Sequence, residues 1–345
     1  MKDCNLIGID IAKNVFQLHG VDKNGKCLFR KRLSRARFQE MLPQLPVCTI
    51  AMEACGSSHY WGRCFSKLGH TVKLISPQHV KPFVKGNKTD KNDAEAIAEA
   101  ALRPSMRFVL SKTIEQQDIQ FMHRIRERVV QQRTALSNQL RGLLLEYGVP
   151  IKQGVATLTG TLPDILEDAS NELSDFMRVE IQTLYEELKA MNKKVDDYDQ
   201  KLRVIYSNSE VAQRLGKIEG VGPVIATAFL GLGDIGSFKN GRQFSAFLGL
   251  VPRECSSGNK KRRLGISKHG NNYLRQILVH GARSVLIRIK NKEDKKSLWL
   301  QALVERRGMN RACCALANKM ARIIWVVIAK GEEYIPSSAA QENAV

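Results

Sequence analysis

The sequence predicts an α/β domain over residues 1–107, a long helical coiled-coil arm over 108–206 and a mainly helical domain over 207–334. Three observations lead to this division. Short apolar segments alternate with helical segments in the first part, two long helical periodicities follow, and the sequence then becomes rich in glycine and basic residues. A length of 345 residues agrees with two or three domains. The polar residues 335–345 are predicted to form a disordered tail.

The first domain is predicted to begin with a meander of three strands and to continue with alternating helices and strands. The meander strands are expected at 5–10, 15–21 and 27–32. Helices are then expected at 35–45 and 60–68, and strands at 47–52 and 71–75. This alternation predicts a sheet that is covered by helices.

The arm is predicted to contain two long amphipathic helices. Apolar residues recur at spacings of three and four, from Ile119 to Leu143 and again from Leu173 to Leu202. Glycines and prolines between 148 and 163 indicate a break that lets the chain reverse. The two helices could pair antiparallel in one chain or between chains. A plain helical core is the alternative, and only the length of the helices favours an arm.

The charge balance indicates a polyanionic partner. The chain has 54 Lys plus Arg against 34 Asp plus Glu, a net charge of +20. No apolar stretch reaches the roughly 18 residues of a membrane span, and the first residues lack the pattern of a secretory signal, so no membrane contact and a cytoplasmic location are expected. The eight cysteines form no C-x-x-C pair, which favours buried free thiols over a zinc site.

Four carboxylates form the first candidate site. Asp10 and Glu53 each end an apolar strand, and Asp90 and Asp93 lie three residues apart at the start of a helix that runs to Leu102. Carboxylate oxygens are the ligands that Mg²⁺ prefers beside substrate phosphates, and a pair of such ions can promote phosphoryl transfer. Taken singly, Asp90 could be present only because a negative charge at the start of a helix interacts favourably with the helix dipole, and Glu53 could be an acid in a turn without a further role.

A serine loop beside basic residues forms the second candidate site. Ser257 precedes Gly258, so a phosphodiester could approach it closely, and nearby cations could neutralise the transition state. Ser-Ser-Gly is also common turn chemistry. The residues expected to contact nucleic acid around this loop are Arg253, Lys260, Lys261, Arg262, Arg263, Lys268 and Arg275.

A glycine-rich turn between two helices is a further candidate for contact with nucleic acid. Gly220 and Gly222 lie in the segment 215–225, where backbone amides at a helix start could meet a phosphate. The alternative is a tight helix connection that needs glycine for close packing.

The chain resembles the DEDD insertion-sequence transposases, a family that includes the pilin-type DNA invertases and the bridge-RNA-guided recombinases. The resemblance covers nearly the whole chain. It is carried, in order, by Asp10 in Ile-Gly-Ile-Asp, Glu53 in Met-Glu-Ala, Lys88 to Ala94, Glu219 to Pro223, and Leu248 to Arg253 with Ser257-Gly258.

The resemblance implies a RuvC-like, RNase H-fold amino-terminal domain in which Asp10, Glu53, Asp90 and Asp93 bind Mg²⁺. It also implies a carboxy-terminal transposase domain with Ser257 as the nucleophile, although the neighbouring Ser256 stays open as an alternative. A homo-oligomer, a tetramer built as a dimer of dimers through the arm, and a structured guide RNA are further implications.

The resulting hypothesis is a DNA recombinase that cuts and rejoins strands of element and target DNA through a covalent phosphoserine intermediate. The first alternative is a metal-dependent nuclease or Holliday-junction resolvase that uses the four acids alone. The second is a non-catalytic nucleic-acid-binding protein, which would leave the four acids without a role.

Overall fold

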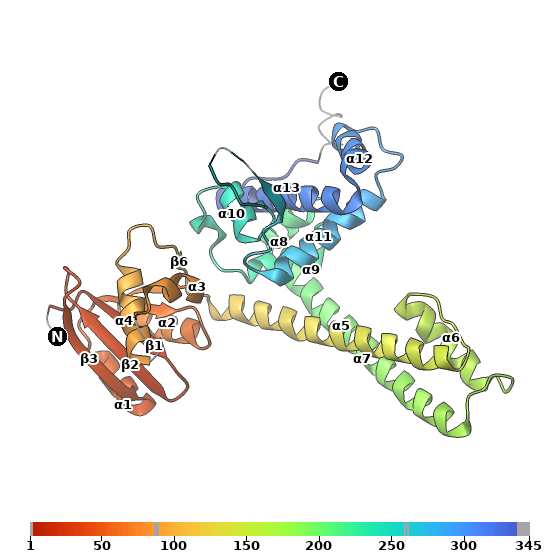
Figure 1. Ribbon diagram of the computed structural model, residues 1–345, viewed down its shortest axis with the longest axis horizontal. Helices are drawn as coiled ribbons and strands as arrows, with labels where there is room; N and C mark the ends of the chain where they lie inside the picture. Colours follow the sequence, from red (N-terminus) through yellow and green to blue (C-terminus); the bar gives the residue numbers. More distant parts are fainter. Residues whose placement is uncertain (1–2, 86–89, 259, 261, 337–345) are drawn as a thin grey trace. The chain divides into compact units, whose positions relative to one another are not determined.

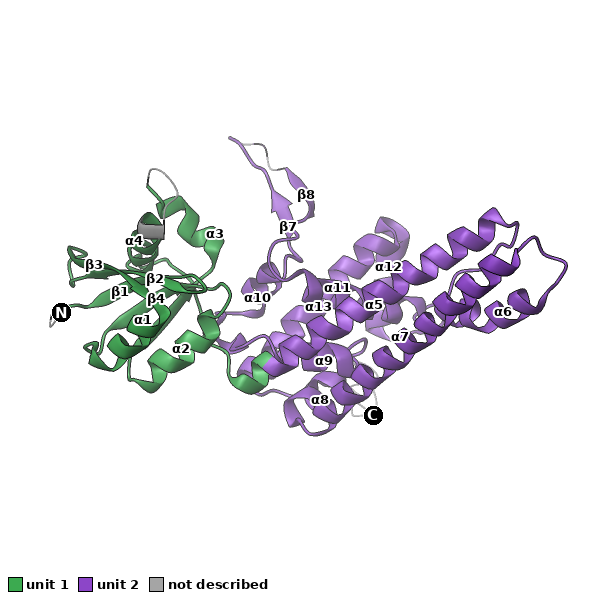
Figure 2. Ribbon diagram, turned by 90° about the horizontal axis from the view of Figure 1, so that it is seen from below, with its two compact units in different colours: residues 1–117 green, residues 118–345 purple. Residues whose placement is uncertain are grey.

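The computed structural model describes residues 3–85, 90–258, 260 and 262–336, and it describes the backbone but not the side chains of Asp90 and Lys91. The chain divides into two compact units, Met1–Gln117 and Asp118–Val345, which Figure 2 shows in green and purple. Most of the predicted arm (118–206) therefore falls in the same unit as the predicted carboxy-terminal domain, whereas residues 108–117 fall in the first unit. The predicted tail lies outside the described residues from 337 onward.

The first unit is built on a six-stranded sheet in the order β3-β2-β1-β4-β5-β6. Strands β1 (Leu6–Ile11), β2 (Val15–Val21) and β3 (Cys27–Ser34) form the predicted antiparallel meander. Strands β4 (Thr49–Glu53) and β5 (Thr71–Ile75) extend the sheet parallel to β1. Strand β6 (Phe108–Val109) was not predicted, because two residues are too short to show alternation.

Helices cover both faces of this sheet, as the alternation predicts (Figure 1). They are α1 (Arg35–Met41), α2 (Ser58–Lys67), α3 (Pro77–Val80) and α4 (Asp90–Ala101), with 3-10 turns at Leu42–Gln44 and Lys81–Phe83. Phe38 of α1 and Trp61 of α2 pack with Phe16 on one face. The alanine-rich α4 covers the other face, so the mixed α/β architecture of the prediction is confirmed.

The second unit begins with an antiparallel helical hairpin. Helices α5 (Ile114–Glu146) and α7 (Asp175–Ser207) lie side by side (Figure 1). Arg126 pairs with Asp199, and Arg133 donates to Asn192 at 3.4 Å. The partner's number falls as the number on α5 rises, so the two helices run antiparallel within one chain.

The break predicted at 148–163 contains a helix that the sequence analysis missed. Helix α6 (Val155–Glu167) includes both Gly160 and Pro163, whose presence argued against a helix. It forms because Leu158 and Leu162 are fully buried in a cluster with Leu140 of α5 and Leu188 of α7. Tertiary burial thus outweighs local propensity in this segment.

The rest of the second unit is a helical body with one projecting β-hairpin. Its elements are α8 (Glu210–Gly216), α9 (Pro223–Leu230), a 3-10 turn (Ile235–Ser237), α10 (Gly241–Phe247), β7 (Pro252–Glu254), β8 (Arg263–Ile266), α11 (Asn272–Ile287), α12 (Lys295–Arg307) and α13 (Met309–Lys330). The apolar side chains of the helices form one core. The mainly helical character predicted for this region is confirmed.

Helix α13 corrects one expectation of the sequence analysis. By length and composition alone it is apolar enough to cross a membrane, whereas no stretch was expected to be. Its buried face, which includes Leu316, Met320 and Ile324, packs in the core with residues of α10 and α11. We therefore assign α13 as the central core helix of this unit.

A buried histidine joins three helices of the second unit. The His123 ring of α5 lies 2.8 Å from Tyr273 Oη of α11 and 3.1 Å from Thr227 Oγ1 of α9. Thr227 Oγ1 donates to Pro223 O, so it accepts from Nε2–H, and Nδ1 accepts from the tyrosine hydroxyl. Burial, and secondarily the charge of Arg126, lowers the pKa of His123 to about 4.

We expect this histidine to make the unit less stable in mild acid. The folded-state pKa lies below the unfolded value of about 6.5, so unfolded chains take up a proton that folded chains exclude as the pH falls from about 6.5 towards 4. The free energy of unfolding should drop by about 2 kcal/mol between pH 7 and pH 5. Urea denaturation of wild type, His123→Gln and the exposed-site control His280→Gln measures this. An equal pH dependence in wild type and His123→Gln would contradict the assignment.

Candidate active site and nucleic-acid interface

The first two acids lie at the ends of adjacent parallel strands. The register pairs Gly8 of β1 with Ala51 of β4 and Ile9 with Met52, so Asp10 and Glu53 come next on their strands. Side chains two residues apart point to the same face of a sheet. Ala51 packs in the core under α4, so Glu53, two residues later, lies on the α4 face of the sheet. Gly8 is paired with Ala51, so Asp10, two residues after Gly8, lies on the same face.

Helix α4 approaches this face closely enough to exclude a side chain. A Cβ on Gly8 would lie 2.4 Å from Ala94 O and 2.8 Å from Ala98 Cβ, so only glycine fits there. Asp93 is half-buried and directly precedes Ala94 in the first turn of α4. The structure thus brings the strand acids and the start of α4 to one side of the sheet, while the side chain of Asp90 is outside the described residues.

A cysteine that the sequence analysis did not single out lies among these acids. Burial raises the pKa of the Cys55 thiol, and the charges of Glu53 and Asp10 raise it further. Both carboxylates therefore lie within electrostatic reach of one sulfur. Its position two residues after Glu53 is the only signal in the sequence that could have indicated this.

The donor set suits a hard cation, although the described side chains alone do not complete a site. Among them, no group of three or more His, Cys, Asp or Glu side chains could hold a metal ion. The side chain of Asp90, the fourth predicted ligand, lies outside the described residues. Carboxylates from two strand ends and a helix start offer the oxygen ligands that Mg²⁺ prefers.

The candidate serine lies at the tip of the β7–β8 hairpin, which projects from the helical body in Figure 2. Ser257 is exposed, and its backbone carbonyl accepts a hydrogen bond from Lys260 N at 3.2 Å. Gly258 has φ +57°, the left-handed conformation that glycine adopts readily. The turn therefore presents the Ser257 hydroxyl to solvent.

The neighbouring Ser256 is placed differently. Its hydroxyl donates to Glu254 Oε1 at 2.7 Å, whereas the Ser257 hydroxyl has no hydrogen-bond partner among the described residues. A carboxylate that accepts the hydroxyl proton can also activate a nucleophile. The geometry thus leaves both serines as candidates.

The hairpin carries the predicted basic residues on exposed positions. Arg253, Lys260, Arg262, Arg263 and, after the hairpin, Lys268 are exposed. None of them forms an ion pair with another residue in the described part of the chain. Lys261 lies outside the described residues. These unpaired cations suit contact with a polyanion.

Two of the residues predicted to contact nucleic acid have structural roles in the second unit. Arg275 is only 8% exposed, and its guanidinium donates to Leu248 O, His269 O and Asn272 Oδ1. Gly220 has φ +87°, and a Cβ there would lie 2.6 Å from Gly281 O of α11. Arg275 therefore fixes the loop before α11, and Gly220 allows two backbones to pack closely. Gly222, by contrast, has open space around its Cα.

Comparison with known proteins assigns the chain to a family. Residues 7–149 match a family of DEDD transposases, and residues 212–298 match the family described as "Transposase IS116/IS110/IS902 family". The chain belongs to the IS110/IS116 transposase family. It is thus an enzyme of a class that acts on DNA.

Similar proteins come from several bacteria. The transposase for insertion sequence element IS1111A of Coxiella burnetii is 51% identical over 97% of this chain and 92% of its own length. A probable family 20 transposase of Pseudomonas aeruginosa is 46% identical over 96% and 98%. The transposase for IS1328 of Yersinia enterocolitica is 40% identical over 96% and 98%. The family matches span both units, so the acids of the first unit and the helical body of the second belong to one transposase.

Proposed function

We propose that this transposase cuts and rejoins DNA through a covalent phosphoserine intermediate on Ser257, with Mg²⁺ held by Asp10, Glu53, Asp90 and Asp93. The observation that carries the proposal is the exposed Ser257 at the tip of a hairpin rich in unpaired cations. A nucleophile for DNA must be reachable by a bulky duplex and surrounded by positive charge. The cytoplasm, where bacterial DNA lies, is the location that this function requires.

The serine chemistry is balanced without a nucleotide cofactor. Ser257 Oγ attacks the phosphorus of a phosphodiester and loses its proton, an Oγ–P bond forms, and the bond from phosphorus to the leaving sugar oxygen breaks as that oxygen takes up a proton. A sugar hydroxyl of a second strand then attacks the phosphoserine and displaces Oγ, which regains a proton. One phosphoester replaces another at each step, so the bond energy is conserved.

The four acids would hold the metal on the α4 face of the sheet in the first unit. Lewis-acid stabilisation of charge on the reacting phosphate is the chemistry that bound Mg²⁺ supplies. Asp10 and Glu53 contribute because the β1–β4 register fixes them on neighbouring strands. We also propose that the acids and Ser257 act together in a site composed across the subunits of a homo-oligomer, a dimer of dimers.

The hairpin cations should set the salt dependence of DNA binding. Each phosphate contact that is lost lowers the slope of log K against log salt by about one. We expect the double variant Arg262→Gln/Arg263→Gln to bind duplex DNA more weakly and to reduce this slope by about two. The matched control is Arg306→Gln/Arg307→Gln, an exposed arginine pair at the end of α12. Binding isotherms at several salt concentrations measure the slopes, and an equal loss in both double variants would refute a specific role for the hairpin.

The test of the proposal is a search for a covalent protein–DNA adduct on a denaturing gel. The alternative, a metal-dependent nuclease or junction resolvase, would cleave without forming one. Guidance by a structured RNA is also part of the proposal, since nothing in the described elements resembles a module that reads bases in the major groove. Sequencing the nucleic acid that copurifies with the protein tests that part.

A further inference from the structure

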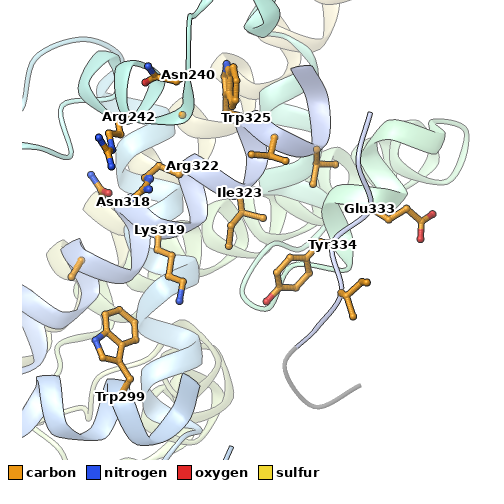
Figure 3. Close-up of a pocket in the computed structure, with 15 residues that line it drawn as sticks. Asn240, Arg242, Trp299, Asn318, Lys319, Arg322, Ile323, Trp325, Glu333 and Tyr334 are labelled. Atoms are coloured by element: carbon orange, nitrogen blue, oxygen red, sulfur yellow. The ribbon is translucent and has the colours of Figure 1, made fainter. Parts of the chain in front are cut away.

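A second basic surface in the second unit is formed by residues outside the β7–β8 hairpin. Helices α10, α12 and α13 line a groove of about 780 Å³ (Figure 3). Ile323 and Val326 of α13 contribute apolar surface to it, and Trp299 of α12 forms one end. A volume in this range is typical of ligand-binding sites.

Three cations surround the groove without acidic partners. Arg242, Lys319 and Arg322 line it and are exposed, and none of them forms an ion pair with a described residue. The one acid that lines the groove, Glu333, is already paired with Lys217 at 3.1 Å. The groove is therefore electropositive and suited to an anion.

The arrangement of two of these cations is fixed by close helix packing. A Cβ on Gly241, at the start of α10, would lie 3.0 Å from Arg322 Cα of α13. The absence of a side chain at Gly241 lets the two helices meet there, which places Arg242 and Arg322 on the same side of the groove (Figure 3). The two guanidinium groups thus form one positive cluster.

An exposed tryptophan faces this cluster across the groove. Trp299 is 40% exposed, whereas Trp61 and Trp325 are buried at 0% and 9%. In the free chain, Lys319 Nζ lies 4.9 Å from the centroid of the Trp299 ring. Exposing an indole costs hydrophobic free energy, and the cation–π interaction with an ammonium offsets only part of this cost. A flat aromatic partner with attached negative charge would satisfy both groups at once.

We propose that this groove binds unpaired nucleotides of a single-stranded nucleic acid. A base stacks on Trp299, the Lys319 ammonium moves from the ring to a phosphate, and Arg242 and Arg322 contact the neighbouring phosphates. Aromatic stacking beside a positively charged path is the general mode by which proteins hold single strands. Duplex DNA does not fit this chemistry, because its base faces are already stacked.

The proposal does not depend on the phosphoserine mechanism, because it concerns binding and not strand transfer. Its test uses the full chain and fluorescently labelled mixed-sequence strands of about 12 nucleotides, as RNA, as DNA and as duplex DNA. We expect Trp299→Ala to weaken single-strand binding by about tenfold or more and to leave duplex binding unchanged. Trp299→Phe should restore most of the affinity, because a phenyl ring still stacks.

Matched variants separate stacking from loss of structure. Leu298→Ala removes an exposed apolar side chain beside Trp299 that does not line the groove, and it should bind like wild type. Arg322→Gln should weaken single-strand binding, whereas Arg311→Gln, an exposed arginine of α13 outside the groove, should not.

Tighter binding of RNA than of DNA identifies RNA as the ligand, and equal binding identifies single strands irrespective of the sugar; both support the site. Unchanged affinity in Trp299→Ala, an equal loss in Trp299→Phe, or the same loss for duplex DNA overturns it.

Discussion

Replacing Ser257 with alanine is expected to abolish the covalent protein–DNA adduct and to reduce strand transfer by at least about a thousandfold. The substitution removes the one atom that forms the new bond to phosphorus, and water cannot store the bond energy for religation. Because Ser257 is exposed at a hairpin tip, the variant should fold like wild type and still bind DNA. A reconstituted recombination assay, with the adduct followed on a denaturing gel, measures the effect.

The matched control is Ser256→Ala, one residue away on the same turn. This variant loses the hydrogen bond to Glu254 but keeps Ser257, so the adduct should persist. If instead Ser256→Ala abolishes the adduct and Ser257→Ala does not, the nucleophile is Ser256, activated by Glu254. Strand cleavage without an adduct in wild type would favour the nuclease alternative.

The fold of the first unit follows closely from local sequence patterns. Strand β2 and strand β5 have the predicted bounds, because each alternates or runs apolar between clear turn residues. Helix α1 ends earlier than expected, at Met41, since Pro43 favours the 3-10 turn that follows. Patterns with a period of two or 3.6 are local, and local patterns can be read without knowledge of the tertiary structure.

Features that depend on tertiary contacts could not be predicted in this way. Helix α6 exists because Leu158 and Leu162 are buried by helices that are distant in sequence. Gly220 was open between a phosphate contact and helix packing, and only the approach of Gly281 shows that it serves packing. Arg275 belongs to a basic stretch in the sequence, yet its hydrogen bonds to Leu248 O and His269 O make it internal.

The acid site of the first unit and the groove of the second unit differ in how readily each could be predicted from the sequence. Asp10 and Glu53 could be selected because an acid that ends an apolar strand needs a partner, and the β1–β4 register then places them side by side on neighbouring strands. The groove of the second unit gave no such signal. Arg242, Trp299 and Lys319 come from three helices and from residues up to 77 apart in the numbering (319 − 242), so no short motif contains them.

Asp10→Asn is expected to reduce both strand cleavage and adduct formation by at least about a hundredfold at saturating Mg²⁺. The substitution keeps the shape of the side chain but removes the charge that would hold a divalent ion at the end of β1. Thermal unfolding with and without Mg²⁺ should therefore show a smaller Mg²⁺-induced rise in Tm for the variant than for wild type.

Glu95→Gln provides the matched control, since Glu95 is a half-exposed acid of α4 that pairs with Arg30 and is not one of the four. It should keep both the activity and the full Mg²⁺-induced rise in Tm. Full activity of wild type in EDTA, or of Asp10→Asn in Mg²⁺, would contradict the metal role. Comparison with Ser257→Ala then separates the two mechanisms. In the recombinase each variant abolishes the adduct, but only Asp10→Asn loses the Mg²⁺-induced rise in Tm. In a simple nuclease Ser257→Ala would cleave as well as wild type.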